Sequence, residues 1–451
     1  MRSGYGRRGR YSRGRSDGRY SAKPRTIYKK LHNVFVLKPC LVFEESPLSP
    51  EIVAFDSALP GVLNGVKVLD LSRLVAGNML TLQLGDHGAD VVKVEAPGRG
   101  DTLRDWRVNG ISAHWKVYGR NKRSITLNLK APEAKDIVLR LVADSDVLVE
   151  SFRHNYLENI GLGPDVLHEA NPRLVIVRIS GFGQTGPYSH RPGFGTIVEA
   201  LSGFASRNGY PDREPVLPPL ALADMIAGVY GALGTMVALR AVADGAPGQV
   251  IDLSLLEAFY SVLGPEALVY DLTGQPRKRL GSASEQSAPR NVYPTADDHW
   301  VAISSSTEAM THRFFVAIGR ADLNDDPRYN THPARVANRP EVDRIIGGFI
   351  RERTLAENMA FFDREGITAG PVYDSSQFSD DPHVVAREVL VNLEDKELGA
   401  IKAHAILPRL SETPGAYRLP APEVGEHNEE VYSGIGMSGE EIAELGRRGV
   451  V

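Results

Sequence analysis

The amino-acid sequence predicts an α/β protein, with a large domain built on a parallel sheet and a smaller α+β domain after it. Short β-rich runs alternate with helical stretches between about residues 66 and 179, and such alternation favours a parallel sheet covered by helices on both faces. The chain has 451 residues, enough for more than one domain, and its 42% hydrophobic and 24% charged residues are ordinary for a globular protein.

The elements of the large domain follow in order along the chain. Five runs rich in Val, Ile and Leu are expected to be strands, at residues 66–71, 89–95, 124–129, 147–150 and 174–179. Helices are expected between them at residues 76–84 and 132–143. Ligands of such sheets bind beyond the carboxyl ends of the strands. We therefore expect the functional site in the loops that follow Leu71, Glu95, Glu150 and Ile179.

Two apolar helices should complete this domain. Residues 222–243 carry Gly and Ala at three- and four-residue spacing, a pattern that lets another backbone approach one helix face. A second helix is expected at about 253–272, after a short strand at 249–252. The expected organisation is a basic, disordered extension at 1–58, the large domain at 59–273, a linker at 274–291, a small α+β domain at 292–400 and a C-terminal segment at 401–451 that returns to the large domain.

The N-terminal segment is strongly basic. Eight Arg and three Lys against one Asp give residues 1–30 a charge of +10, so the remainder carries −14 of the total of −4. With almost no aliphatic side chains to bury, this segment is expected to be disordered. Its composition suits an RNA- or anion-binding arm or a transit peptide, but we favour an extension without a role in the chemistry. The acidic remainder makes nucleic acid an unfavoured partner.

Several classes of protein are excluded at this stage. Cys40 is the one cysteine, so neither an intrachain disulfide nor a thiolate-rich metal site can form, and the histidines lack metal-ligand spacing. No GxSxG motif supports a serine hydrolase. No run of 18 uncharged apolar residues predicts a membrane-spanning helix, and no apolar signal region follows the basic segment. We expect a cytoplasmic enzyme without a bound metal or a tightly bound cofactor.

One motif resembles a dinucleotide-binding fingerprint. Gly181-Phe182-Gly183-Gln184-Thr185-Gly186 spells GxGxxG directly after an expected strand. In a nicotinamide site this motif opens a helix that holds the pyrophosphate. Here Pro187 and then Pro192-Gly193 follow, which cannot form the body of a helix. The motif therefore predicts a tight turn whose amides approach a ligand, and not a nicotinamide site.

Asp224 is the candidate catalytic residue on physical grounds. It is a lone carboxylate among Ala, Leu, Met and Ile, in the first turn of the expected helix at 222–243. An acid at this place can simply favour the helix dipole or cap the helix. It can also be a carboxylate nucleophile in an apolar pocket, with amides nearby to stabilise an oxyanion. The residues alone leave both readings open.

Taken together, the motifs resemble the class III CoA-transferases, the family of formyl-CoA transferase, carnitine CoA-transferase and α-methylacyl-CoA racemase. The resemblance covers residues 59–451 and leaves out residues 1–58. Its clearest motifs are the glycine turn from Gly181 to Pro187 and Gly366-Ile367-Thr368-Ala369-Gly370-Pro371. The matching segments are residues 68–73, 76–77, 84–95, 100–104, 121–125, 149–152, 181–187, 223–224, 326–329, 366–372 and 425–427.

The resemblance implies a Rossmann-like large domain, a small domain, and a homodimer in which the two chains interlock as rings. It implies that Asp224 is the nucleophile, because this residue stands at the family's nucleophile position. Asp224 would attack a donor acyl-CoA to form a mixed anhydride and then an aspartyl-CoA thioester, from which CoA passes to an acceptor acid. Coenzyme A and acyl-CoA are then substrates.

The resemblance also implies a set of CoA contacts, most of them in the loops nominated above. The implied contacts are Leu74, Val75, Ala76, Ala96, Leu127, Lys130, Ser151, Phe152, Asn159, Ser180, Gly181, Phe182 and Gly183. Two of them depart from the family, because the basic residues often found at the positions of Ala96 and Asn159 are absent. The family's frequent Ala-Gly-Pro is Ala76-Gly77-Asn78 here.

Branches of the family differ in their chemistry. A racemase would need a histidine at the position of Phe194, whose ring cannot carry a proton, and His190 lies four residues away. The glycine run of formyl-CoA transferase is missing near residues 282–287, which weighs against oxalate. We therefore favour CoA transfer between carboxylic acids, with succinyl-CoA as the expected donor, and keep the racemase as the alternative. Arg191, Arg207 and Arg213 are candidates to meet a second carboxylate.

Overall fold

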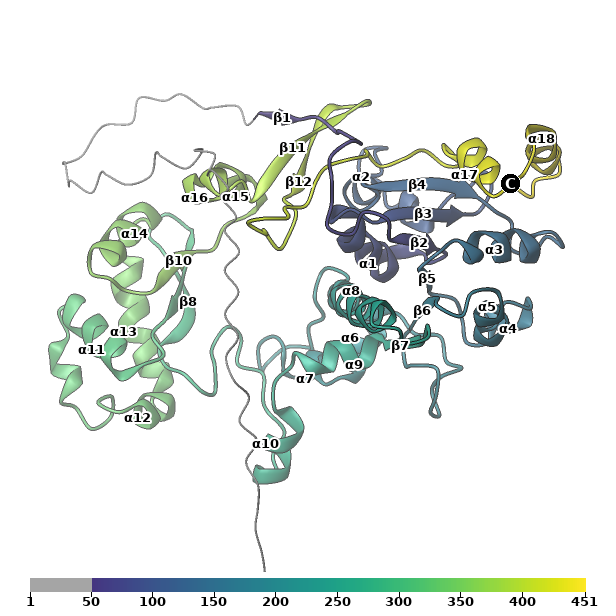
Figure 1. Cartoon of the computed structure of the whole chain (residues 1–451). Coiled ribbons are helices and arrows are strands. Elements are labelled where there is room, and N and C mark those ends of the chain that lie inside the picture. The colour runs from purple at the N-terminus through teal and green to yellow at the C-terminus, as the bar shows by residue number, and fades with distance from the viewer. Residues whose placement is uncertain (1–50) are drawn as a thin grey trace, which may run out of the picture. The chain divides into compact units, whose positions relative to one another are not determined.

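The structure is a computed structural model, and it describes residues 51–451 (Figure 1). The expectations for the basic segment at residues 1–30, including an RNA-binding arm, and those for Cys40 lie outside the described residues.

A six-stranded parallel sheet forms the centre of the α/β region and confirms the fold class expected from the sequence. Its strands lie in the order β4-β3-β2-β5-β6-β7, and every neighbouring pair is parallel. The strands are β2 Lys67–Asp70, β3 Asp90–Glu95, β4 Lys122–Thr126, β5 Val147–Glu150, β6 Val175–Ser180 and β7 Val250–Ser254. The order reverses direction between β2 and β5, which makes their carboxyl ends the topological switch point of the sheet.

Helices cover both faces of this sheet. Adjacent residues of one strand enter different cores: Val147 packs with α1, α8 and α9, whereas Leu148 packs with α3, α5 and α17. A strand buried on both faces is apolar throughout, which explains the continuous runs in the sequence. The helices of this region are α1 Leu74–Asp86, α2 Ala113–Tyr118, α3 Ala134–Ala143, α4 Tyr156–Asn159, α5 Pro164–Ala170, α6 Gly195–Leu201, α7 Phe204–Arg207, α8 Leu222–Ala243, α9 Leu255–Ser261 and α10 Glu266–Thr273, with a 3-10 turn at Thr102–Asp105.

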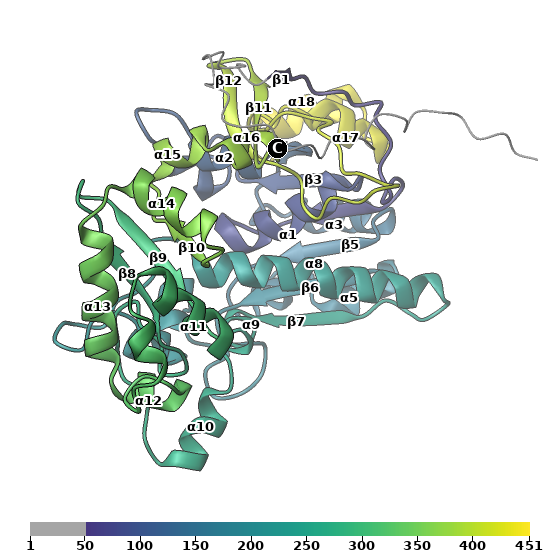
Figure 2. The ribbon, with the colours of Figure 1, turned by 90° about the vertical axis from the view of Figure 1, so that its left-hand side faces the viewer.

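The small residues of α8 pack against α1 of the same chain, and the two helices lie side by side (Figure 2). A Cβ at Gly228 would stand 2.6 Å from Met79 Cβ, and a Cβ at Gly231 would stand 2.4 Å from Leu80 Cδ1. Glycine is therefore required at both positions for the helices to approach this closely. The close backbone approach predicted for this helix occurs within the chain.

The opposite face of α8 is apolar and exposed, at Val229, Leu233 and Val237. Within residues 51–451, α8 is also the one helix long and apolar enough to cross a membrane by length and composition. The sequence predicts no membrane-spanning helix, because no run of 18 apolar residues is free of charge. Asp224 and Arg240 are the charged residues that interrupt the apolar sequence of α8. Its packing against α1 is that of a core helix.

The second apolar helix differs from its prediction. A single helix was expected at 253–272, but the structure has α9 and α10 separated by residues 262–265. Pro265 lacks an amide hydrogen and disfavours a helical conformation in the residue before it, and that residue is Gly264, which has φ of +88°. The helix therefore ends and starts again.

A second, antiparallel sheet lies in the smaller α+β region. It has the order β10-β9-β8, with β8 Arg290–Pro294, β9 Trp300–Ser304 and β10 Ala369–Pro371. Phe314, Phe362 and Ile346 form the centre of a separate core between this sheet and its helices. The helices are α11 Glu308–Ala317, α12 His332–Ala337, α13 Arg339–Arg351, α14 Leu355–Arg364, α15 Ser375–Asp380 and α16 Pro382–Ala386, with a 3-10 turn at Ala321–Asn324.

A third sheet was not anticipated. It has the order β1-β11-β12, with β1 Ile52–Val53, β11 Leu390–Asp395 and β12 Gly399–His404. Disorder was expected through residue 58, but Ile52 and Val53 pair in parallel with Asn392 and Leu393. The prediction is wrong for these residues, because backbone hydrogen bonds to a distant strand leave no mark in local composition.

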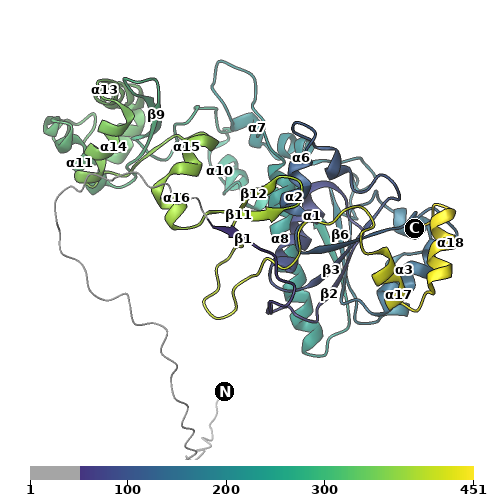
Figure 3. The same ribbon diagram turned by 90° about the horizontal axis from the view of Figure 1, so that it is seen from above.

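The C-terminal residues pack on the parallel sheet. The helices α17 Asn428–Gly434 and α18 Gly439–Arg447 lie beside α3 (Figure 3). Tyr432 is fully buried and its hydroxyl donates to the carbonyl of Thr126, the last residue of β4, at 2.5 Å. Ser438 and Glu441 form a capping box that starts α18.

Candidate active site

A cavity of about 360 Å³ opens at the switch point of the parallel sheet. The loops that follow β2, β5 and β6 supply most of its wall, and the first turn of α8 supplies Asp224. This is where the sequence placed the site. The lining residues are Arg73, Leu74, Ala76, Thr102, Ser151, Phe152, Arg153, His154, Ile179, Ser180, Gly181, Ser189, His190, Arg191, Pro192, Gly193, Phe194, Asp224 and Leu255.

Asp224 lies half-buried in this cavity, directly against the backbone of α6. A Cβ at Gly195 would stand 2.1 Å from Asp224 Oδ2, so no other residue at position 195 leaves the carboxylate where it is. Burial, with the nearby negative charge of Glu199 adding to it, raises the pKa of Asp224 to about 6. A carboxylate of this basicity in a partly enclosed cavity has the properties of a nucleophile.

Glu199 is a site residue that the sequence analysis did not identify. It belongs to α6, its side chain is buried, and its Oε1 accepts the backbone amide of Ala223 at 3.0 Å. The sequence holds one sign that such a residue is needed: Ala221, at the N-cap of α8, has no side-chain oxygen to accept an amide at the helix start. A helix start of this kind needs an acceptor from elsewhere, but the sequence does not say from where.

The glycine turn after β6 forms one wall of the cavity. Gly181 and Gly193 are in backbone contact, since a Cβ at Gly181 would stand 2.6 Å from Gly193 Cα. The Gly183 amide donates to Ser180 Oγ, and the Gln184 amide donates to Asp252. No helix opens within residues 181–187, and the next helix begins at Gly195. The structure thus agrees with the rejection of a nicotinamide site.

Cationic and imidazole side chains surround Asp224. Arg73, Arg153 and Arg191 line the cavity, and the Arg191 guanidinium lies 3.7 Å from the ring centroid of Tyr188. His154 Nδ1 is buried and has no hydrogen-bond partner among the described residues. Positive charge and an unused polar atom suit a ligand that carries phosphates or carboxylates.

The implied CoA contacts fall into two groups. Leu74, Ala76, Ser151, Phe152, Ser180 and Gly181 line the cavity together with Asp224. Val75, Phe182 and Gly183 adjoin it: Val75 is buried beside Leu103 and Trp115, and Phe182 packs on Tyr188. Ala96, Leu127, Lys130 and Asn159 do not line the cavity. Ala96, Lys130 and Asn159 are exposed near the ends of β3, β4 and β5, whereas Leu127 is buried in the core.

A buried network of charges supports the loop that carries Leu74. Leu74 has φ of +62°, a left-handed conformation that is strained for leucine, and its amide donates to Asp101 Oδ1 at 3.0 Å. Lys93 is fully buried between Asp101 and Asp70, at 3.1 and 3.2 Å. Burial alone would lower the pKa of Lys93, but these carboxylates outweigh it and raise that pKa. The network therefore holds the β2–α1 loop in its strained form.

Two loops meet across the switch point. The Arg73 amide, after β2, donates to Ser151 Oγ, after β5, at 2.9 Å. The loops that carry Leu74 and Phe152 are thereby joined at the cavity, although they lie 78 residues apart in sequence. The strand pattern of the sequence predicts that both loops lie at one edge of the sheet, but it does not predict the hydrogen bond between Arg73 and Ser151.

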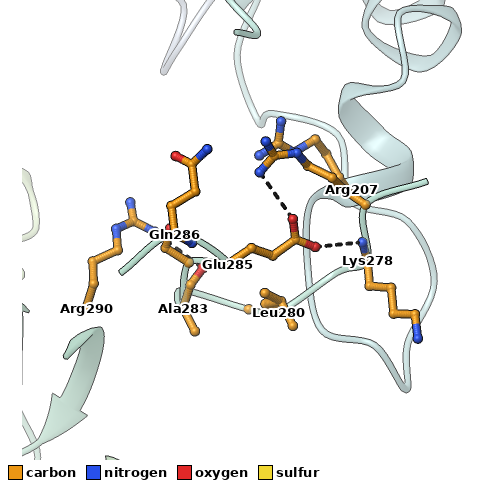
Figure 4. Close-up of a pocket in the computed structure, with 10 residues that line it drawn as sticks. Arg207, Lys278, Leu280, Ala283, Glu285, Gln286 and Arg290 are labelled. Atoms are coloured by element: carbon orange, nitrogen blue, oxygen red, sulfur yellow. Dashed lines mark hydrogen bonds and ion pairs between the residues drawn. The ribbon is translucent and has the colours of Figure 1, made fainter. Parts of the chain in front are cut away.

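The structure separates the three arginines proposed to meet a second carboxylate. Arg191 lines the Asp224 cavity. Arg207 lines a different cavity of about 290 Å³, together with Lys278 and Glu285 (Figure 4). Its guanidinium forms an ion pair with Glu266, which does not line that cavity. Arg213 lies over the ring of Tyr210 and lines neither cavity. Of the three, only Arg191 is placed to meet a ligand beside Asp224.

No group of three or more metal-ligating side chains occurs among residues 51–451. The ionisable side chains that line the cavity are the carboxylate of Asp224, the guanidinium groups of Arg73, Arg153 and Arg191, and the imidazoles of His154 and His190.

Comparison with known proteins identifies the family. The sequence profile of CoA-transferase family III matches residues 63–428. The chain is 38% identical over 396 residues to succinyl-CoA–D-citramalate CoA-transferase of Chloroflexus aurantiacus, covering 87% of this chain and 98% of the relative. It is 39% identical to the beta subunit of succinyl-CoA–L-malate CoA-transferase of the same organism, covering 86% and 98%.

The solved structures agree. A crystal structure of a CAIB/BAIF family protein from Brucella suis superposes with a TM-score of 0.74 at 30% sequence identity, covering 84% of this chain and all of that protein. These relatives are named as CoA-transferases or by the family, so the racemase alternative is not favoured. The chain therefore belongs to CoA-transferase family III and is a CoA-transferase.

Proposed function

We propose that the enzyme transfers CoA from succinyl-CoA to a second dicarboxylic acid, with Asp224 as the nucleophile. The observation that carries the proposal is the position of Asp224: a carboxylate of raised pKa, in a cavity lined by arginines, at the carboxyl ends of a parallel sheet. The names of the relatives support succinyl-CoA as donor and a four- or five-carbon dicarboxylate as acceptor.

In the first half of the proposed reaction, an Asp224 oxygen attacks the thioester carbonyl of succinyl-CoA. The carbon–sulfur bond breaks, and a mixed anhydride and CoA thiolate are formed. The thiolate then attacks the Asp224 carbonyl and breaks the anhydride, which releases succinate and leaves an aspartyl-CoA thioester. Each step exchanges one activated acyl bond for another, so no external energy source is needed.

The second half reverses these steps on the acceptor. The acceptor carboxylate attacks the aspartyl thioester and expels CoA thiolate. The thiolate then attacks the acceptor carbonyl of the new anhydride, which frees Asp224 and gives the acceptor acyl-CoA.

The charged residues of the cavity have separate proposed roles. Arg73 and Arg153, in the loops after β2 and β5, lie where the CoA phosphates would reach the strand ends. Arg191 is proposed to meet the distal carboxylate of the dicarboxylate. Its guanidinium lies 3.7 Å from the ring centroid of Tyr188 and makes no ion pair within residues 51–451, so it can bind a carboxylate with two donors.

We further propose that two copies of the chain interlock as rings. The exposed apolar face of α8 at Leu233 and Val237, and that of α10 at Leu268 and Leu272, support this proposal. Leu272 is 77% exposed, which is unusual for a large aliphatic side chain on a helix. A second copy that covers these faces would remove them from water.

The decisive experiment combines a substrate panel with one substitution. Purified enzyme is incubated with succinyl-CoA and each of a series of mono- and dicarboxylic acids, and new acyl-CoA is identified by mass spectrometry. Asp224→Asn should reduce transfer by several orders of magnitude while CoA binding changes little, because the lost step is covalent. Treatment of the wild type with succinyl-CoA and hydroxylamine should modify Asp224. Near-normal transfer by Asp224→Asn would overturn the mechanism.

A further inference from the structure

The helix that carries Asp224 does not cap itself. The amides at the start of a helix have no partner within it, and a side-chain oxygen at the N-cap usually accepts one of them. The N-cap of α8 is Ala221, whose methyl group cannot accept. Glu199 Oε1 supplies the missing acceptor and takes the amide of Ala223, the residue next to Asp224, at 3.0 Å.

A buried glutamate is an uncommon acceptor for a backbone amide at a helix start. Its side chain is 1% exposed, and it makes no ion pair within residues 51–451. A neutral side chain, such as that of Ser or Asn, could accept the same amide without the cost of burying a charge. The negative charge therefore needs an explanation beyond the hydrogen bond. Asp224 follows the residue whose amide Glu199 accepts, its carboxylate contacts α6 at Gly195, and the charge of Glu199 acts on it.

We propose that Glu199 is the positioning residue of the nucleophile: it fixes the first turn of α8 through Ala223 and places beside Asp224 a negative charge whose repulsion is relieved when Asp224 is acylated. This inference rests on the proposed role of Asp224. In the free enzyme both side chains are carboxylates, Glu199 on α6 and Asp224 on α8, and α6 contacts the Asp224 carboxylate at Gly195. Acylation converts Asp224 into a neutral anhydride or thioester, so the repulsion disappears as the covalent intermediate forms.

The other charged groups near Asp224 come from the remaining loops of the cavity. Arg73 follows β2, Arg153 and His154 follow β5, and His190 and Arg191 follow β6. All of them can be positive and none can repel a carboxylate, so within residues 51–451 Glu199 is the like charge that acts on Asp224. These groups are the same in the wild type and in a Glu199 variant. A difference in pH dependence between the two proteins is therefore due to Glu199.

The test is the rate of Asp224 acylation by succinyl-CoA in the presence of hydroxylamine, followed by mass spectrometry at pH 5 and pH 8. Glu199→Gln keeps an oxygen that can accept the Ala223 amide but removes the charge. If Asp224 then titrates about one pH unit lower, its ionised fraction at pH 5 rises about fivefold, and acylation should be faster than in the wild type. At pH 8 a less basic carboxylate is a weaker nucleophile, so acylation should be about threefold slower.

This change of sign between the two pH values distinguishes the proposal from a purely structural role, which would lower the rate at both. Glu199→Ala removes hydrogen bond and charge together and should be slow at both pH values, with Gln at position 199 restoring the rate at pH 5. Glu357→Gln is the matched control, because Glu357 also accepts an amide at a helix start, that of Thr354 at 2.8 Å, and does not line the cavity.

The outcomes separate this inference from the proposed function. If the wild type forms its adduct at Asp224 but Glu199→Gln is equal to it, or slower by the same factor at pH 5 and pH 8, the role of Glu199 is disproved and that of Asp224 stands. If the wild type forms no adduct at Asp224, the proposed mechanism fails first. Faster acylation of Glu199→Gln at pH 5 together with slower acylation at pH 8 supports both.

Discussion

Gly195 and Asp224 are in contact: the carboxylate of Asp224 occupies the space that a side chain at position 195 would need, with Oδ2 2.1 Å from the position of a Cβ. The nucleophile proposed for this transferase is thus placed by a residue that has no side chain. Because α6 begins at Gly195, the start of one helix sets the position of a carboxylate on another.

The first prediction concerns this contact. Gly195→Ala should displace the Asp224 carboxylate and lower kcat by about a hundredfold, since a shift of about 1 Å in a reacting group has that effect. Binding of CoA, measured by calorimetry, should change much less. Gly348→Ala, on α13 with open space around its Cα, is the control and should keep full activity. Normal turnover in Gly195→Ala would show that Asp224 does not need its present position.

The second prediction concerns stability. Because the pKa of Asp224 is raised in the folded protein from 3.8 to about 6, the folded state binds a proton more tightly than the unfolded state. The resulting stability is present in full below pH 3.8 and is lost as pH rises through about 6. Above pH 6 the charged carboxylate therefore costs stability, about 1–3 kcal/mol after allowance for its partial exposure.

Asp224→Asn, which cannot ionise, should accordingly be more stable than the wild type at pH 7.5, and the difference should shrink at pH 5. Midpoints of thermal or urea unfolding at the two pH values measure this. An Asp224→Asn variant that is less stable than the wild type at pH 7.5 would contradict the raised pKa and favour an interaction of the Asp224 charge with the helix dipole.

The third prediction concerns acid selectivity. Arg191→Ala should raise KM for dicarboxylic acceptors by tenfold or more and leave monocarboxylic acceptors nearly unaffected, because only the former lose a charge-assisted contact. Arg213→Ala is the matched control, since Arg213 also lies over a tyrosine but does not line the cavity. Equal loss on both acid classes would assign Arg191 to CoA and not to the distal carboxylate.

The fourth prediction concerns the buried network under the β2–α1 loop. Asp101→Asn keeps an acceptor for the Leu74 amide but leaves the buried Lys93 with one carboxylate fewer, and should cost about 2–4 kcal/mol of unfolding free energy. Asp105→Asn, four residues after Asp101, is the control. It removes the exposed ion-pair partner of Arg99 and should cost less than about 1 kcal/mol of unfolding free energy. Similar urea midpoints for the two variants would show that the network adds little.

The fifth prediction concerns the interlocked dimer. Two separately tagged preparations, mixed in the native state, should form no mixed dimers over days, because rings cannot separate without unfolding. Joint denaturation and refolding of the same mixture should produce them. A monomer that remains folded on dilution, or rapid native exchange, would exclude interlocked rings and require an ordinary surface contact at α8 and α10.

The sequence predicted those features that follow from local patterns. The strands from β2 to β6 appear as buried apolar runs, and the ends of these strands predicted the cavity. Asp224 stood out as a lone charge in an apolar helix start.

What the sequence did not predict depends on contacts between distant segments. Glu199 on α6 gives no local sign that it will meet Ala223, and Asp101 gives none that it will hold Leu74 in a left-handed conformation. The pairing of β1 with β11 joins residues some 340 positions apart. Such contacts depend on how distant segments pack in the folded protein. A burial pattern in the sequence indicates which face of a helix or strand is buried, but not which segment packs against it.

The pairing of β1 with β11 has a practical consequence for shortened versions of the protein. β11 is the middle strand of its sheet only because Ile52 and Val53 cover one side of it. Removal of residues 51–58 would turn β11 into an open edge with free backbone groups, which invites strand-to-strand aggregation. Protease sites and affinity tags should therefore be placed ahead of Glu51.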